Sequence, residues 1–121
     1  MSATKVLEAL NNISGLSDLV SDRIELSPAR QGLATPYIAY ELDGDDPVVD
    51  LNGTADITRQ DWNIFICSES FIDAETIARL VIKQFPQQKS ILYATFINSS
   101  SDYDDDTKVY TYEVNFKITY R

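Results

Sequence analysis

The stretch Tyr110–Tyr120, YTYEVNFKITY, decides the fold, because large and polar side chains alternate along it without exception. The large side chains all point one way and are Tyr110, Tyr112, Val114, Phe116, Ile118 and Tyr120. The polar side chains point the other way and are Thr111, Glu113, Asn115, Lys117 and Thr119. This period of two is typical of an antiparallel strand with one face buried and one face in water. We therefore predict a strand over 110–120 that contributes one face to the core.

Residues 71–85 have the period of a helix. Apolar side chains recur there at intervals of three and four, at Ala74, Ile77, Ala78, Val81 and Phe85. Ser70 precedes this run as a predicted N-cap, and Asp73 lies in the first turn, where a negative charge is favourable. Pro86 cannot continue a helix. This segment is the predicted main helix.

Shorter segments complete the predicted organisation. We expect a short helix over 4–12, a helical turn over 17–21, and strands over 23–26, 37–42, 57–67 and 91–98. Residues 44–56 (GDDPVVDLNGTAD) and 99–107 (SSSDYDDDT) are predicted loops, because Gly, Pro, Ser and Asp favour turns. The result is an α+β fold: a mostly antiparallel sheet of four to five strands, one main helix packed on one face, and a short N-terminal helix. With no repeat or linker, residues 1–121 are predicted to form one domain.

The charge of the chain opposes tight binding to nucleic acid. The chain has 19 acidic against 10 basic residues and a net charge of −9. Most acids fall in two clusters, within 41–61 and 102–106. Binding to phosphate backbones is driven by Lys and Arg that displace counterions, so this surface is expected to repel DNA.

Residues for catalysis are scarce. The chain has no histidine, and its single cysteine, Cys67, is predicted to be a small core residue. The two acidic clusters lie in predicted loops, so we interpret their side chains as solvated and not as an acid–base pair. We therefore expect no enzyme activity and no cofactor. Asp102, Asp104, Asp106 and Glu113 match four positions of a calcium-binding loop, but Thr107 stands where that loop needs glycine. We therefore predict no dedicated metal site.

Three pieces of sequence carry a resemblance to a known family. They are SDLVSDRIELSPARQGLATPYIAYEL (17–42), TRQDWNIFICSES (58–70), which leads into the helix DAETIARLVIKQF (73–85), and the closing YTYEVNFKITYR (110–121). Their order resembles the phage tail-completion family, the tail-terminator or tail-to-head joining proteins. The resemblance spans nearly the whole chain, although each motif is short and none is catalytic.

The resemblance implies a structural virion protein at the neck of the tail, assembled in the host cytoplasm. Its subunits would form a ring, generally a hexamer, at the head-proximal end of the tail tube. The ring would end tube polymerisation and join the tail to the head connector. The implied partners are copies of itself, the tail tube protein, the head connector or stopper protein, and DNA that passes through the lumen without specific binding. No membrane partner is expected, since the longest apolar runs have only a few residues.

Two sets of residues are candidate sites under this interpretation. The first comprises candidate lumen acids, which are Asp102, Asp104, Asp105 and Asp106, or alternatively the acids within 43–50. An acidic lumen would let phosphates slide, but an acidic outer loop kept for solubility explains these residues equally well. The second set is a candidate inter-subunit arm: Val48, Val49 and Leu51. These apolar residues either reach a neighbouring subunit or pack on their own sheet, and exposed strand edges offer a second route to assembly.

Two other functions remain open from sequence alone. The chain could be a different ring of the same neck, such as a head-completion protein. It could also be a small monomeric binding module whose acidic residues mimic DNA and block a DNA-binding partner. An enzyme is disfavoured by the missing histidine and the missing motifs.

Overall fold

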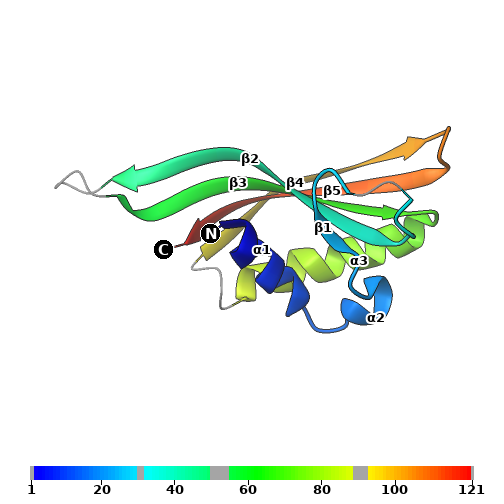
Figure 1. The fold of residues 1–121 in the computed structure, drawn as a ribbon, viewed down its shortest axis with the longest axis horizontal. Coiled ribbons are helices and arrows are strands. Elements are labelled where there is room, and N and C mark those ends of the chain that lie inside the picture. Colours follow the sequence, from blue (N-terminus) through cyan, green and yellow to red (C-terminus); the bar gives the residue numbers. More distant parts are fainter. Residues whose placement is uncertain (1, 30–31, 50–54, 89–92, 121) are drawn as a thin grey trace.

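The computed structural model describes residues 2–29, 32–49, 55–88 and 93–120, and only the backbone of residues 2, 45–49, 55–58 and 120. Helices and one sheet form two layers, with all helices on the same face of the sheet (Figure 1). The helices are α1 (Ser2–Asn11), α2 (Ser17–Val20), α3 (Phe71–Gln84) and the 3-10 turn η1 (Phe85–Gln87). The strands are β1 (Ile24–Leu26), β2 (Tyr37–Val49), β3 (Ala55–Ser68), β4 (Tyr93–Asp104) and β5 (Val109–Tyr120).

The five strands have the spatial order β1-β2-β3-β5-β4. Only β1 and β2 pair in parallel, and the other three pairings are antiparallel. The predicted α+β class, the element order and the mostly antiparallel sheet are therefore confirmed. No helix in the described ranges is long and apolar enough to cross a lipid bilayer.

The main helix begins and ends as its sequence predicts. The Ser70 hydroxyl accepts a hydrogen bond from the Asp73 amide at 3.3 Å, as an N-cap does. The predicted apolar face of α3 is buried, and Pro86 lies in η1 directly after the last α-helical turn. The side-chain amide of Gln84 makes two hydrogen bonds to the backbone of Ser14, of 3.0 and 3.2 Å. These bonds hold the loop between α1 and α2 against the end of α3.

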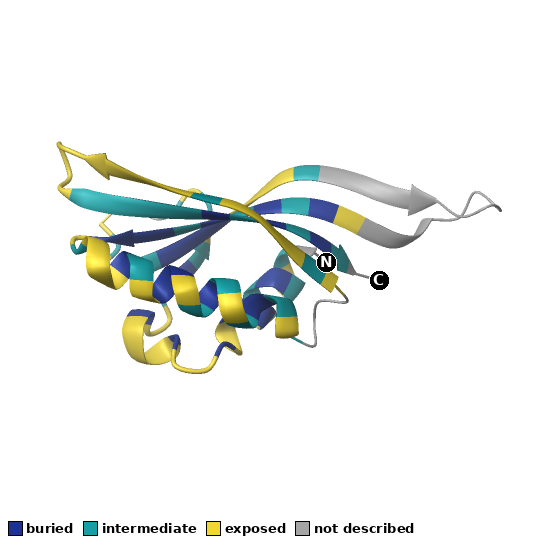
Figure 2. Cartoon of the chain, turned by 180° about the vertical axis from the view of Figure 1, so that it is seen from behind, coloured by how far each residue is buried: buried dark blue, intermediate teal, exposed yellow. Residues whose placement is uncertain are grey.

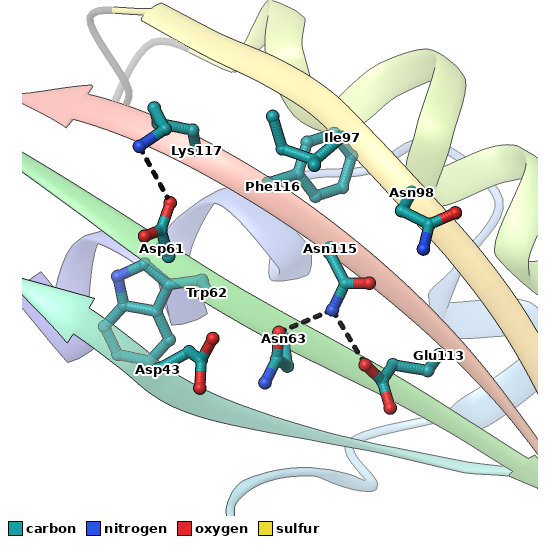
Figure 3. A pocket seen from close by; sticks show the side chains of 10 residues that line it. All are labelled: Asp43, Asp61, Trp62, Asn63, Ile97, Asn98, Glu113, Asn115, Phe116 and Lys117. Carbon is teal, nitrogen blue, oxygen red and sulfur yellow. Dashed lines mark hydrogen bonds and ion pairs between the residues drawn. The ribbon is translucent and has the colours of Figure 1, made fainter.

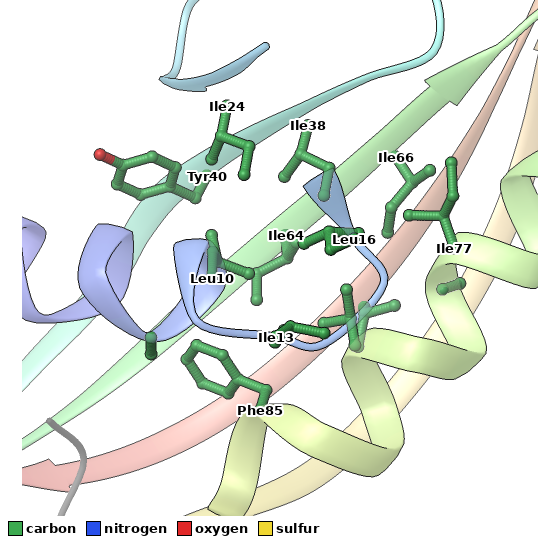
Figure 4. Close-up of a cluster of buried hydrophobic side chains, with 14 of the residues drawn as sticks. Leu10, Ile13, Leu16, Ile24, Ile38, Tyr40, Ile64, Ile66, Ile77 and Phe85 are labelled. Atoms are coloured by element: carbon green, nitrogen blue, oxygen red, sulfur yellow. The ribbon is translucent and has the colours of Figure 1, made fainter. Parts of the chain in front are cut away.

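The hydrophobic core lies between the helices and one face of the sheet (Figure 4). Its largest fully buried side chains are Trp62, Phe85, Phe116, Leu10 and Leu16. In β5 the predicted inward row is only partly buried. Val114, Phe116 and Ile118 are buried, whereas Tyr110 and Tyr112 are half-exposed. Figure 2 shows this change in burial along the sheet, from the part covered by helices to the exposed tip of the β4–β5 hairpin.

The predicted loop over 44–56 is wrong at both of its ends. β2 runs on to Val49 and β3 starts at Ala55, so 44–49 and 55–56 are strand, whereas 50–54 lie outside the described residues. Gly44 and Pro47 suggested a break, but both fit an edge strand. Among the described residues β1 covers only Ile38–Tyr40 of the outer edge of β2, and a proline is tolerated where no ladder bond is required.

The predicted loop over 99–107 is also mostly wrong. β4 extends to Asp104, and only the turn before Val109 separates it from β5. The Ser and Asp residues of 99–104 have weak strand propensity, but the strong alternation of β5 provides a partner for each of them. At the turn, the Lys108 amide donates to the Asp104 carbonyl at 2.8 Å, and Lys108 has a positive φ of 59°.

Two β-bulges lie in one row across the sheet. The row consists of Leu42, Trp62, Phe116 and Phe96, which are successive register partners. Next to it, β2 has the extra residue Asp43 and β4 has the extra residue Ile97. A bulge bends its strand and increases the local twist, so the sheet curves at this row.

Candidate functional site

The helix-free face of the sheet is the strongest candidate site, because the described helices all lie on the other face (Figures 1 and 2). Residues 27–29 and 32–35 border one end of this face, where they line cavities with Tyr37 and Cys67. Register partners share a face, so the ion pair and hydrogen bonds of β3 and β5 identify the side chains that lie there. On the central strands these are Asp61, Asn63, Glu113, Asn115 and Lys117. They are the polar half of the alternation in β5 and their partners in β3.

A groove of about 580 Å³ crosses this face at the bulges (Figure 3). It is lined by Asp43, Asp61, Trp62, Asn63, Ile97, Asn98, Glu113, Asn115, Phe116 and Lys117. Both bulge residues, Asp43 and Ile97, belong to this lining. The groove therefore forms where the two extra residues bend the sheet.

The polar side chains in the groove form an ion pair and hydrogen bonds with one another. Lys117 Nζ lies 3.2 Å from Asp61 Oδ1, and both side chains are close to half-exposed. The Asn115 side-chain amide donates to Asn63 Oδ1 and, at 2.9 Å, to Glu113 Oε2. An exposed ion pair of this kind contributes little to stability. The network instead orders the side chains that a partner on this face would meet.

Acidic side chains outnumber basic ones on this face. Among the described side chains of β2–β5, the acids on it are Glu41, Asp43, Asp61, Asp102, Asp104 and Glu113. The bases are Arg59 and Lys117, and Lys117 is paired with Asp61. The face is therefore polar and carries net negative charge.

Two smaller cavities flank Tyr37, Cys67 and Thr111 at the other end of the same face. Their volumes are about 490 and 310 Å³, and these three residues line both. The Cys67 sulfur lies 3.7 Å from the Thr111 hydroxyl, and burial, followed by the hydrogen bond with Cys67, raises the pKa of Tyr37 to about 12. Cys67 is buried, as predicted, but on the helix-free side of the sheet and outside the main core cluster. Among the described residues that line the two cavities, none is a basic side chain that would activate a thiol.

The four candidate lumen acids are all exposed and occupy the β4–β5 hairpin. Asp102 and Asp104 alternate with Tyr103, whose ring packs on Tyr110 at 4.5 Å, so the two acids lie on the helix-free face. Asp105 and Asp106 belong to the turn, where the Asp106 amide donates to Asp104 Oδ1 at 2.9 Å. Asp104 lines the cavity near Tyr37, away from the groove at the bulges.

The candidate arm is only partly described. Val48 and Val49 end β2 in the β2–β3 hairpin, where only the backbone is described, and Leu51 lies outside the described residues. The register places Val48 and Val49 opposite Ile57 and Ala55, beyond the last residue of β3 that pairs with β5. The described part of the hairpin therefore projects past the neighbouring strands (Figure 1).

The sequence interpretation missed the side-chain network of the groove. Asn63 and Asn115 were not singled out, although Asn115 belongs to the polar half of the alternation in β5. Their pairing depends on the register between β3 and β5, which the sequence alone does not provide. Within the described part of the chain, no group of three or more Cys, Asp or Glu side chains could hold a metal ion.

Comparison with known proteins identifies the fold. No protein-family profile matches the chain, and no curated protein matches it in sequence. Among solved structures, the chain is similar to one from the "Virion of native gene transfer agent (GTA) particle", with a TM-score of 0.72 and 16% sequence identity. The match covers 94% of this chain and 90% of that chain. At this identity the match shows a shared fold over nearly the whole length of both chains.

Proposed function

We propose that this chain is a structural virion protein that forms a ring at the head-proximal end of a phage tail tube. In this role it ends tube polymerisation and joins the tail to the head connector. Two observations support the proposal: the fold is shared with a chain of a gene transfer agent virion, and the sequence pieces within 17–121 resemble tail-completion proteins. The protein acts through its surfaces, and no bond is made or broken.

The observation that carries the proposal is the contrast between the two faces of the sheet. One face holds the core under the helices, and the helix-free face is mostly polar and carries net negative charge. In a ring with its helices outside, the helix-free face lines the lumen. Its charge repels the phosphates of DNA, so the nucleic acid slides without being held.

Under this proposal Asp102 and Asp104 line the lumen, and Asp105 and Asp106 sit at its rim. The β2–β3 hairpin, with Val48, Val49 and Leu51, reaches toward a neighbouring subunit. A monomeric DNA mimic would need the same acids but no ring. A different neck ring would share the lumen but bind filled heads instead of tube ends.

Electron microscopy of the purified protein mixed with tail tubes and with filled heads tests the placement. We expect rings on one end of the tubes and shorter tubes when the protein is present during polymerisation. Rings on filled heads alone would assign the chain to a different neck position. A protein that binds neither, and stays monomeric at every concentration, would contradict the proposal.

Matched variants test the lumen. The first replaces Asp104, Asp105 and Asp106 with Asn, which keeps the carbonyl that accepts the Asp106 amide. The control carries Glu8→Gln, Asp18→Asn and Asp22→Asn, at exposed positions on or near α1 and α2. Both change the net charge from −9 to −6, since each removes three acids. We expect both to form rings and only the first to slow DNA delivery by assembled particles; equal delivery by the two would contradict the lumen assignment.

A further inference from the structure

The β4 strand forms one edge of the sheet and is unprotected along its first part. Residues 93–101 (YATFINSSS) contain no charge and no proline, and the side chains of Tyr93, Phe96 and Ile97 are 63%, 40% and 54% exposed. Soluble proteins usually protect a long edge with lysine, proline or a short strand, because an open edge pairs with other chains. An uncharged edge of this length is suited to pairing.

The opposite edge of the sheet is open over a matching length. β1 pairs only with Ile38–Tyr40, so within the described residues nothing covers the outer edge of β2 from 41 to 49. This stretch carries Glu41, Asp43, Asp45 and Asp46. A partner strand with acids of its own would be repelled there, whereas an uncharged strand would not.

The two open stretches lie at the same level over residues 93–98 and 41–46. Across the sheet, Asp46 is level with Tyr93, and Glu41 is level with Asn98. Ser99–Ser101 are level with Ile38–Tyr40, the part of β2 that β1 covers. Residues 93–98 of one edge therefore face residues 41–46 of the other when copies stand side by side.

The strand directions also agree. Three successive antiparallel pairings separate β2 from β4, so the two strands run in opposite directions. A rotation about an axis along the strands preserves these directions in every copy, so β4 of one copy would meet β2 of the next in antiparallel orientation. The contact is head-to-tail and closes into a ring with the helices of all copies on one side.

From these observations we propose that copies of this chain join by antiparallel pairing of β4 residues 93–98 with β2 residues 41–46 of the next copy. The occupant of each open edge is a second copy of the same chain. The inference rests on the proposed ring and specifies how its subunits meet. It gives a continuous sheet around the ring, whose inner surface is the helix-free face.

A pair of variants tests the edge. The double variant Thr95→Asp/Ile97→Asp places acids against the acidic edge of β2. Thr95 is exposed and lies opposite Lys117, so the new charge has a favourable partner within its own subunit. The control, Ile72→Asp/Thr76→Asp, makes the same two changes at exposed residues of α3, where Ile72 is 73% exposed. Circular dichroism and urea unfolding verify that both variants fold.

Light scattering over a dilution series, alone and with tail tubes, measures assembly. We expect the edge variant to need roughly tenfold more protein for half-assembly, or more, and the control to match the natural chain. Hydrogen exchange gives a second readout: the outward-facing amides of 93–98 and 41–46 should gain protection together on assembly. Rings in which 93–98 exchanges as fast as in the monomer, or unchanged assembly of the edge variant, would overturn edge pairing.

These outcomes separate the inference from the proposed function. Rings whose β4 and β2 edge amides are protected from hydrogen exchange, but which never bind tail tubes, would support edge pairing and overturn the position on the tube. Rings on tube ends with an unprotected β4 would support the position and overturn edge pairing. A chain that assembles neither alone nor on tubes would overturn both.

Discussion

Truncating Phe116 to alanine should be among the most damaging single changes to the core. Its side chain is 1% exposed and lies between two other rings, with centroids 4.8 Å from Phe85 and 6.0 Å from Phe96. Removing a buried phenylalanine costs roughly 3–5 kcal/mol, because the transfer free energy is lost and a cavity remains. Phe96 is 40% exposed, so Phe96→Ala should cost only about 2 kcal/mol. A chain of this length is expected to have roughly 6–18 kcal/mol of stability, so both variants should fold.

Urea unfolding, monitored by tryptophan fluorescence, measures the free energy of unfolding lost in each variant. Trp62 is the only tryptophan, is 1% exposed and is the register partner of Phe116, so its emission reports on this part of the core. The slope of the unfolding free energy against urea concentration should be the same in the natural chain and in both variants, which would show that unfolding exposes the same surface in all three. A cost for Phe116→Ala below about 1.5 kcal/mol, or no larger than that of Phe96→Ala, would refute the assignment of Phe116 to the covered face.

Three further outcomes follow from local contacts. Ser70→Ala should cost about 1 kcal/mol in urea unfolding through loss of the hydrogen bond to the Asp73 amide, whereas a Ser70→Asp control should retain most of the stability. Stability should fall as the pH rises from 10 to 12, because burial and the Cys67 hydrogen bond raise the pKa of Tyr37 from 10.0 to about 12, so the folded state holds the proton more tightly. Tyr37→Phe should flatten that decline in unfolding curves recorded across this range, and an unchanged decline would contradict the assignment. Lys108→Gly should stabilise the chain by about 0.5 kcal/mol in thermal unfolding, since its φ of 59° disfavours residues with a Cβ; a loss of stability would show that the lysine side chain outweighs the strain.

The parts of the fold that were predictable are those with strong local periodicity. Apolar residues recur with a period of two along β5 and with a period of 3.6 along α3, and the structure places both elements as predicted. The extents of β2 and β4 were not predictable in the same way. Gly44, Pro47 and Ser99–Ser101 have poor strand propensity on their own, and only pairing with β3 and β5 holds them in the sheet.

The candidate site was predictable by composition but not by arrangement. The polar half of β5 follows directly from the alternation, and the acids of 102–106 were recognised as a cluster. Which residues meet across strands depends on register, and the bulges at Asp43 and Ile97 shift that register by one residue. No local signal in the sequence marks either bulge, so the groove between them could only be seen in the structure.

The paired bulges bear on the size of any closed assembly. Curvature built into each sheet by an extra residue determines how far one copy turns relative to the next, and hence how many copies complete a circle. Deleting Ile97 would leave Phe96 opposite Phe116 and Asn98 opposite Asn115 in a ladder without the extra residue, so the bend at this point of β4 would be lost. The circumference of such an assembly thus depends on two single-residue insertions as well as on the surfaces where copies touch.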